Sequence, residues 1–231
     1  MQPILIKAKT LPEAWFLCLQ ELYERLEIWD GRTEGGMEIG EGAHIYTITR
    51  GSFVGHQRLE FDYVTIHIEY PGSRPLVPDV PQGIPAPVTQ EYIDGYLPYL
   101  MCGAKAKNED YTYGQDLEEQ IPQIIKGYKE DGYNQNQMFM AVGSKDSLRL
   151  KDPQCLRMID TRIQDGKLHF IVYFRSWDLW GGFPANLGGI QILKEYMASE
   201  IGVEDGELIA SSKGLHLYDY SWDLAKGVLR R

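Results

Sequence analysis

Residues 167–174, with the sequence KLHFIVYF, constrain the fold more than any other stretch of the chain. The run is almost continuously apolar, which is typical of a strand inside a sheet that is covered on both faces. Helical spacing follows at 186–201, where Leu187, Ile190 and Leu193 recur on one side. The sequence therefore predicts a sheet flanked by helices.

The other predicted elements do not alternate regularly between strand and helix. A helix is predicted from Thr10, because Thr10 and Glu13 can form a capping box and apolar residues then recur with helical spacing up to Leu26. Further helices are predicted at 89–101 and 116–129, and further strands at 43–49, 59–69, 137–142, 207–211 and 214–218. This order favours an α+β fold (a mixed α/β arrangement) with a mixed β-sheet, and argues against a doubly wound dinucleotide-binding fold.

The length of 231 residues is long for one domain and short for two. Residues 71–88 hold six prolines and two glycines and cannot form a regular element. We expect a surface excursion there rather than a linker, because the sequence after it lacks an independent set of core elements. Residues 1–231 are therefore expected to form a single domain.

The formal net charge of −10 disfavours binding to nucleic-acid polymers and anionic membranes, but a small anionic substrate can still be held by clustered arginines. No apolar run is long enough to span a membrane, and the N-terminus lacks the apolar core of a signal peptide. Three cysteines, an odd and sparse number, favour a reducing compartment. We expect a cytoplasmic protein without a metal, because its histidines and cysteines show no metal-ligand spacing.

The functional signal lies in four short motifs: DPQC at 152–155, YFRSWD at 173–178, FPAN at 183–186 and GLHLY at 214–218. Each motif alone is weak, since a lone cysteine is more often a small buried residue than a nucleophile. Their order and spacing change this balance. Cys155 precedes Arg175 by 20 residues. Arg175 precedes Asn186 by 11 residues and His216 by 41, and the series makes Cys155 a candidate nucleophile.

This series resembles the thymidylate synthase family, whose pattern is a catalytic cysteine, an Arg-Ser-x-Asp segment after an apolar strand, then Pro-x-Asn and His-x-Tyr. The resemblance is strongest over about 152–220 and includes the Asp-Gly-Lys turn at 165–167. It is thinner over 110–150, where Tyr113-Gly114 fits, and weak before that, where Arg32-Thr33 resembles the family's phosphate loop. The short chain is most similar to the compact archaeal branch of the family.

The resemblance implies that Cys155 adds to C6 of dUMP as a thiolate, which makes C5 nucleophilic toward a one-carbon electrophile. Nearby cations would favour the thiolate, since a free cysteine has a pKa of about 8.5. Arg175, Ser176 and Arg32 would bind the 5′-phosphate, and Arg175 would also lie near the thiolate. Tyr113 would help to remove the C5 proton.

Other residues are implied to bind the base, the sugar and the one-carbon carrier. The amide of Asn186 can both donate and accept, so it can pair with N3–H and O4 of uracil, whereas the family's cytosine-using hydroxymethylases carry Asp at that position. His216 and Tyr218 lie two apart on an extended segment and project from one side, and in the family this pair binds the sugar 3′-hydroxyl. Asp178 matches an acidic residue that orients the carrier ring and a nearby water.

The implied reaction is the methylation of dUMP to dTMP with 5,10-methylenetetrahydrofolate or a methanopterin-type analogue, by a homodimer that uses no metal. Two alternatives stay open. One is a hydroxymethylase acting on deoxyuridylate or deoxycytidylate, in which water rather than hydride completes the reaction. The other is a deoxynucleotide-binding homologue without catalysis, and the presence of Cys155 argues against it.

The sequence departs from the family pattern at three places. Leu156 follows the nucleophile where the family commonly has His. Asn136-Gln137 stands near the place of an arginine pair that reaches the partner subunit's phosphate site. Thirteen residues follow Tyr218, so we do not expect the long tail that closes over folate in the family. The part of the site that binds the one-carbon carrier is therefore expected to differ from the family more than the part that binds the nucleotide.

Overall fold

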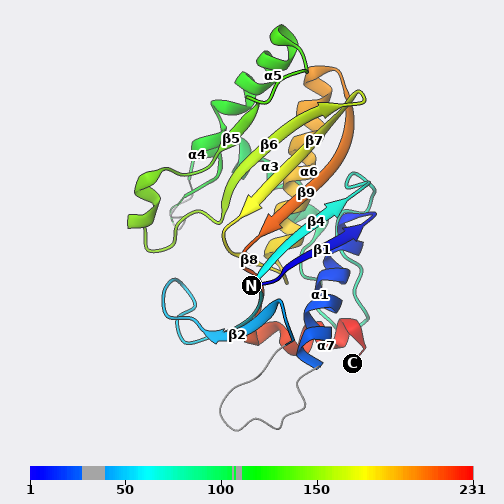
Figure 1. The fold of residues 1–231 in the computed structure, drawn as a ribbon, viewed down its shortest axis with the longest axis vertical. Coiled ribbons are helices and arrows are strands. Elements are labelled where there is room, and N and C mark those ends of the chain that lie inside the picture. The colour runs from blue at the N-terminus through cyan, green and yellow to red at the C-terminus, as the bar shows by residue number, and fades with distance from the viewer. Residues whose placement is uncertain (28–39, 106, 108–110, 231) are drawn as a thin grey trace.

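The structure is a computed structural model that describes residues 1–27, 40–105, 107 and 111–230. Its strands form two β-sheets (Figure 1). The larger sheet has the spatial order β1 (Pro3–Ala8), β4 (Tyr63–Ile68), β9 (Glu204–Ser212), β7 (Lys167–Phe174), β6 (Leu156–Gln164) and β5 (Phe139–Ala141). The smaller sheet has the order β2 (Ala43–Thr47), β3 (Gln57–Phe61), β10 (Leu215–Tyr218) and β8 (Trp177–Asp178).

The longest helix, α6 (Gly182–Ile201), packs against β7 and β9 and lies behind the larger sheet in Figure 1. The other helices are α1 (Leu11–Glu27), α2 (Gln90–Asp94), α3 (Leu97–Met101), α4 (Gly114–Leu117), α5 (Gln120–Asp131) and α7 (Trp222–Leu229). In the larger sheet, β1 pairs with β4 and β7 with β9 in parallel, while the other pairs are antiparallel. The predicted α+β fold with a mixed sheet is therefore confirmed, although its strands are divided between two sheets.

Strand β7 forms where the sequence predicts it, but its two faces differ. Leu168, Phe170 and Phe174 are fully buried toward the helices, as a strand in a sheet interior requires. Ile171 and Tyr173 on the opposite face are only half-buried. The expectation that both faces of this strand are covered is thus met on one face only within a single chain.

Helix α6 is buried along most of its length because small residues let a neighbouring segment approach it closely. A Cβ added at Gly188 would lie 2.6 Å from Ile93, and one at Gly189 would lie 2.4 Å from Tyr96. Glycine at these two positions therefore allows the α2–α3 segment to pack directly on the backbone of α6. The helix begins at Gly182, so the FPAN motif lies in its first turns.

Two predicted helices are each divided in two, and prolines explain both breaks. The helix expected at 89–101 is divided into α2 and α3, because Pro98 has no N–H to donate to the carbonyl four residues earlier. The helix expected at 116–129 is divided into α4 and α5 just before Pro122, for the same reason. Residues 71–88, all of them described, form no helix or strand, as predicted.

The strand expected at 59–69 is also divided, at Asp62. Its first half is β3 in the smaller sheet and its second half is β4 in the larger sheet. The Asp62 backbone N–H donates to the Gly42 carbonyl, and its carboxylate accepts from the Gln2 N–H at 3.1 Å. Asp62 is therefore the corner at which the chain passes from one sheet to the other. Strands β1, β6 and β8 and helix α7 were not predicted from the sequence.

The buried apolar side chains of the described residues form one continuous core between the sheets and helices. The strand ends of β6 and β7 in the larger sheet meet β8, which pairs with β10 in the smaller sheet. Within the described ranges, no helix combines the length and the apolar character that crossing a bilayer would require. The junction between the two sheets holds most of the predicted site residues.

Candidate active site

A β-hairpin brings Cys155 and Arg175 together. β6 and β7 pair from Gln164–Lys167 to Leu156–Phe174, joined by a turn in which Asp165 and Gly166 both have positive φ. This turn type matches the twist of a hairpin and favours Asp-Gly. Beyond the last pair, the Arg175 N–H donates to the Cys155 carbonyl at 2.9 Å. The spacing of 20 residues between nucleophile and cation is thus set by hairpin geometry.

The Arg175 side chain holds the segment that precedes Cys155. Its Nε donates to the Gln154 carbonyl at 3.1 Å, and its Nη2 donates to the Asp152 carboxylate at 3.0 Å and to the Pro153 carbonyl. Two of its three nitrogens are therefore engaged with the DPQC motif. This leaves Nη1 as the nitrogen of Arg175 that can reach a substrate.

The Cys155 thiol is enclosed but accessible. Burial raises its pKa above the ordinary value, and Asp152 acts in the same direction. The Arg175 cation, a hydrogen bond from Tyr111 and the Arg58 cation act in the opposite direction. The net effect is a resting thiol that keeps its proton at neutral pH and has cations nearby to stabilise the thiolate once it forms.

The smaller sheet forms the opposite wall. Its register pairs Tyr218 with Arg58 and His216 with Glu60 across β10 and β3, and places Asp178 beside His216 across β8 and β10. The rings of His216 and Tyr218 meet edge to face with centroids 4.6 Å apart. Both line the cavity that contains Cys155, so the expectation that they project from one side agrees with the structure.

His216 is neutral and presents an acceptor. Its Nδ1 lies 2.8 Å from the Gly214 carbonyl, which fixes the proton on Nδ1. Burial and the Arg58 cation lower its pKa to about 3, so the ring stays uncharged at neutral pH. Its buried Nε2 has no partner among the described residues. The free Nε2 lone pair can accept a hydrogen bond from a hydroxyl group.

Six of the predicted residues line one cavity of about 500 Å³: Cys155, Arg175, Ser176, Asp178, His216 and Tyr218. Sequence analysis missed three further cations in its wall, namely Arg50, Arg58 and Lys151. Asp152 and Asp178 are the carboxylates of the lining, so its formal side-chain charge is +2. This cavity is therefore cationic in a chain whose net charge is −10.

Two of the missed cations come from a distant part of the chain, whereas Lys151 directly precedes the DPQC motif. Arg58 is on β3, and Arg50 is on the β2–β3 loop, where its Nη2 donates to the Leu150 carbonyl at 3.0 Å. The only local signal was a basic residue beside a glycine at Arg50-Gly51. Arg32, the predicted phosphate ligand before residue 110, lies outside the described residues.

Asn186 does not line the Cys155 cavity. Its Oδ1 accepts from Trp177 Nε1 at 2.9 Å, and its Nδ2 donates to the Tyr96 hydroxyl at 2.6 Å. It lines a neighbouring cavity of about 460 Å³ whose walls include Pro87, Tyr92 and Tyr96. Both ends of the amide that was predicted to pair with uracil are therefore engaged by aromatic side chains in this structure.

Asp178 lies between the two cavities. Its Oδ2 accepts from the Gly181 and Gly182 N–H groups at 3.0 and 2.9 Å, and its Oδ1 accepts from the Trp180 N–H at 3.2 Å. Burial raises the pKa of this carboxyl, although the three backbone donors act in the opposite direction. The residue thus fixes the start of α6 and joins the wall of one cavity to that of the other.

Tyr113 lies behind the nucleophile and does not line the Cys155 cavity. It is buried, and its hydroxyl accepts from the Leu156 N–H at 3.3 Å. Burial raises its pKa well above the ordinary value, so the phenol is protonated at neutral pH. Tyr111, which was not predicted, is the tyrosine that lowers the pKa of the Cys155 thiol.

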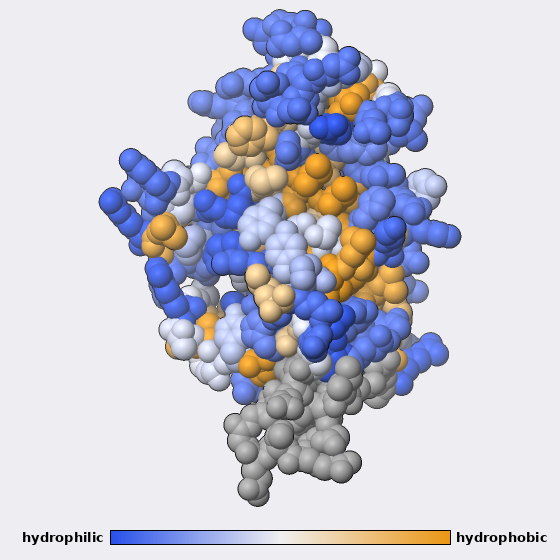
Figure 2. All heavy atoms as spheres, in the orientation of Figure 1, coloured by the Kyte–Doolittle hydropathy of each residue, from blue (hydrophilic) through white to orange (hydrophobic). Residues whose placement is uncertain are grey.

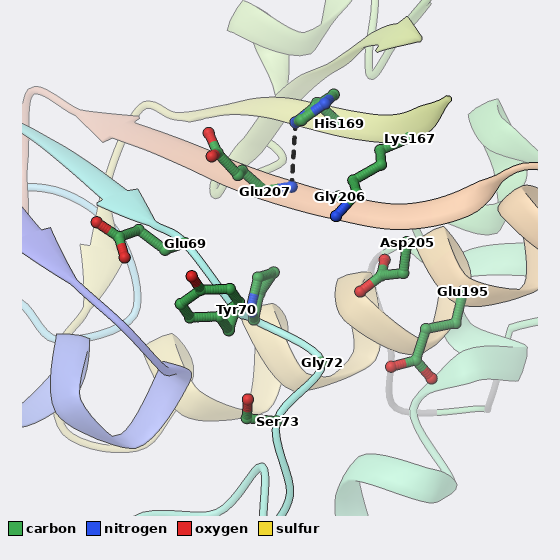
Figure 3. A pocket seen from close by; sticks show the side chains of 11 residues that line it. Glu69, Tyr70, Gly72, Ser73, Lys167, His169, Glu195, Asp205, Gly206 and Glu207 are labelled. Atoms are coloured by element: carbon green, nitrogen blue, oxygen red, sulfur yellow. Dashed lines mark hydrogen bonds between the residues drawn. The ribbon is translucent and has the colours of Figure 1, made fainter. Parts of the chain in front are cut away.

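A different cavity, of about 620 Å³, lies at the other end of β7 (Figure 3). Its lining is acidic and includes Glu69, Glu195, Asp205 and Glu207, with no cysteine. Among the described residues, no group of histidine, cysteine and carboxylate side chains is arranged to hold a metal ion. None of the eight predicted site residues that the structure describes lines this acidic cavity.

Comparison with known proteins agrees with the geometry around Cys155. A family model described as Thymidylate synthase matches residues 82–231, which is more than half of the chain. The chain belongs to the thymidylate synthase family. Family membership assigns it to the transferases of nucleotide biosynthesis.

Relatives from archaea match nearly the whole chain. A protein of Methanosarcina acetivorans named "Putative thymidylate synthase" is 27% identical over 98% of this chain and 94% of its own length. A protein of Methanosarcina mazei with the same name is 28% identical over the same shares. The thymidylate synthase of Listeria monocytogenes is 29% identical over 49% of this chain and 36% of its own length. The predicted similarity to the compact archaeal branch is thus confirmed.

Proposed function

We propose that this protein methylates dUMP to dTMP through a covalent bond between Cys155 and C6 of uracil. One observation carries the proposal: the hairpin fixes Cys155 against Arg175 at the wall of a cationic cavity whose other wall holds His216 and Tyr218. A cysteine enzyme that modifies a nucleotide needs three parts: a nucleophile, a cationic space for the phosphate and groups that bind hydroxyls.

The charge of the Cys155 cavity supports a nucleoside monophosphate as substrate. A formal side-chain charge of +2 matches one phosphate dianion. Ser176 lines the same wall and offers a hydroxyl donor. The free His216 Nε2 and the Tyr218 hydroxyl on the opposite wall are suited to the sugar 3′-hydroxyl.

In the proposed reaction, Cys155 Sγ bonds to C6, and the electron pair of the C5–C6 double bond moves toward C5 as an enolate. The thiol must first lose its proton, since burial holds the pKa of Cys155 above its ordinary value, and Arg175 stabilises the resulting anion. C5 then takes up the one-carbon unit and loses its proton. Tyr113 would serve only through a relay, because its protonated hydroxyl does not line the cavity. The bond from the new carbon to its carrier would break, hydride supplied by the carrier would complete the methyl group, and departure of the thiolate would restore the C5–C6 double bond.

The cavity beside Asp178 is proposed to bind the one-carbon carrier, a methylenetetrahydrofolate or a methanopterin-type analogue. Its walls suit a planar heteroaromatic ring, because Tyr92, Tyr96 and Pro87 offer flat surfaces while Asn186 places an amide at one side. The carrier, when bound, supplies the methylene carbon and the hydride. Asp178 would orient its ring and a water.

The open face of the larger sheet supports a homodimer as the working form. Apolar residues gather near the middle of this face in Figure 2. Leu5 and Phe139 are 61% and 54% exposed, and Ile171, Tyr173 and Ile209 are half-buried on the same sheet. A second copy would cover this surface, as contiguous apolar patches on a sheet usually require. Sedimentation of the purified protein should give twice the mass of the chain.

An adduct experiment tests the proposed reaction. The protein is incubated with 5-fluoro-dUMP and methylenetetrahydrofolate, and its intact mass is measured. We expect a stable adduct, because fluorine at C5 cannot leave as a proton would. Cys155→Ser should form none. Tight binding of dUMP without an adduct, whichever one-carbon carrier is supplied, would instead favour a nucleotide-binding protein without catalysis.

Product analysis distinguishes methylation from the alternative. With dUMP and carrier, chromatography should show dTMP. Hydroxymethyl-dUMP as the product would reject methylation and keep the covalent step, because water would then have completed the reaction in place of hydride.

A further inference from the structure

Arg58, one of the cations in the Cys155 cavity, has no contact with the substrate in the reaction as proposed. Arg58 lies on β3, directly opposite Tyr218 on β10 in the sheet register. Its side chain is 17% exposed, so it lies mostly within the wall rather than in solvent. No family motif contains it, and it comes from a strand almost 100 residues before Cys155 in the sequence.

Arg58 bridges the two walls of the cavity. Its Nη2 donates to the Tyr218 hydroxyl at 3.0 Å, and its Nη1 lies 3.4 Å from Ser176 Oγ and 3.3 Å from the Tyr46 hydroxyl. The guanidinium carbon also lies 5.0 Å from the centre of the Tyr218 ring. It therefore contacts one residue predicted to bind phosphate and one predicted to bind the sugar.

None of the hydrogen bonds of Arg58 is to a charged group. All three partners are neutral hydroxyls, two of them at long distance. Glu60 Oε2 forms an ion pair with Nη1 at 4.0 Å, beyond hydrogen-bond distance, and the buried Nε has no partner among the described residues. A guanidinium binds best to an anion that can accept two bonds at once. An anionic group between Arg58 and Ser176 would supply the hydrogen-bonded negative charge that the protein itself does not supply.

The other two arginines of the cavity are more exposed and partly engaged. Arg175 donates from two of its nitrogens to the DPQC segment, and Arg50 donates from Nη2 alone to the carbonyls of Leu148 and Leu150. The Arg175 side chain is 29% exposed and Arg50 is exposed, whereas the Arg58 side chain is 17% exposed. The charge of Arg58 is therefore the least screened by solvent of the three.

We propose that Arg58, together with Ser176, binds the phosphate of the substrate, while its bond to the Tyr218 hydroxyl orients that residue toward the sugar. The inference rests on the proposed function, since it takes a nucleoside monophosphate as the substrate class. It assigns to one buried residue of the same chain a charge that Asn136-Gln137 cannot provide. Arg58 thereby sets the preference of the site for a nucleotide over the corresponding nucleoside.

Titration calorimetry with dUMP and with deoxyuridine tests this assignment. Arg58→Gln should weaken dUMP binding by about 10- to 100-fold, as expected for a lost charge-assisted hydrogen bond, and should leave deoxyuridine binding within about threefold of the unchanged protein. Arg58→Lys should recover part of the preference, because it keeps the charge and loses the fork. Arg74→Gln, which removes the same charge at the acidic cavity, should leave both affinities unchanged.

Three results would overturn the assignment. An equal loss for dUMP and deoxyuridine would mean that Arg58 acts only through Tyr218 or through folding. Unchanged dUMP binding in Arg58→Gln would mean that phosphate is held elsewhere. If Arg58→Gln does not fold, Arg58→Met decides, because it keeps the apolar stem and removes the charge, and a nucleotide preference equal to that of the unchanged protein would contradict the assignment. Failure of the proposed function is distinguishable, since the unchanged protein would then form no 5-fluoro-dUMP adduct.

Discussion

The two cavities at opposite ends of β7 differ in charge more than in size. The Cys155 cavity, of about 500 Å³, has four basic side chains and two carboxylates in its lining. The cavity in Figure 3, of about 620 Å³, is lined by four carboxylates with one lysine and one histidine. The larger of the two therefore repels the anionic substrate that the smaller would attract.

Two of the four carboxylates of the acidic cavity, Glu195 and Asp205, are paired with neighbouring side chains. Arg74 makes two hydrogen bonds to the Glu195 carboxylate, at 2.9 and 2.8 Å. Lys194, fully buried beneath, lies 3.3 Å from Asp205. Gln191 donates to both carboxylates. These bonds attach the segment around Gly72 to α6, so the acidic cavity is explained by folding, whereas the Cys155 cavity has donors and acceptors to spare.

The largest expected difference between the two cavities comes from replacing the nucleophile in the Cys155 cavity. Cys155→Ser should lower the rate of dTMP formation by at least about 1,000-fold, because a hydroxyl cannot replace the thiolate. The rate is measured by product chromatography at saturating dUMP. Cys102→Ser, which changes an exposed cysteine away from both cavities, is the matched control and should retain activity. Loss of activity in both variants would contradict the assignment.

The variant Asn186→Asp tests which base the Cys155 cavity prefers. The ratio of kcat/KM for dCMP over dUMP should rise by about 10- to 100-fold, because a carboxylate cannot donate to O4 of uracil. Tyr96→Phe is the companion variant, since it frees the Asn186 Nδ2 from the Tyr96 hydroxyl and should preserve the preference for dUMP. If the ratio of kcat/KM for dCMP over dUMP is unchanged in Asn186→Asp, the Asn186 side chain serves only to bind Trp177 and Tyr96.

Substitutions around the acidic cavity should change the stability of the protein and leave its activity unchanged. Arg74→Gln should lower the free energy of unfolding by about 1 kcal/mol, because the pair with Glu195 is bidentate but half-exposed. Denaturant titration measures this, with Lys126→Gln as the control for an exposed pair on α5. The idea fails if Arg74→Gln lowers kcat/KM and leaves the unfolding midpoint where it was.

The smallest expected effect concerns the protonation of Cys155. In a Cys102→Ser background, alkylation of Cys155 by iodoacetamide should rise with pH to a midpoint above that of a free thiol, because burial raises the pKa of this residue. Mass spectrometry after timed quenching gives the rate at each pH. Glutathione under the same conditions is the reference. A midpoint below that of glutathione would mean that the cations outweigh burial.

Local patterns in the sequence predict the parts of the site that one hairpin and its extension build. The apolar run of β7, the Asp-Gly turn and the spacing from Cys155 to Arg175 are all encoded within 21 consecutive residues. The same holds for His216 and Tyr218, whose alternation on one strand fixes their common face. These residues meet as expected because short-range geometry decides where they lie.

Other parts depend on pairings that no local pattern specifies. Arg58 reaches the site only because β3 pairs with β10, across about 160 residues of sequence. Asn186 turns toward Tyr96 because Gly189 lets the α2–α3 segment approach α6, a contact that spacing alone does not reveal. The breaks before Pro98 and Pro122, by contrast, follow from the missing N–H of proline and were available from the sequence.

The hairpin that carries Cys155 also predicts how the gene can change. The pairing of β6 with β7 already shifts by one residue between Leu156 and Met158, so inserting or deleting one further codon between Cys155 and Arg175 would change which side chains share a face. Residues 71–88 have no such pairing to preserve. Natural variation in length should therefore accumulate in the proline-rich excursion, while the distance between nucleophile and cation stays constant.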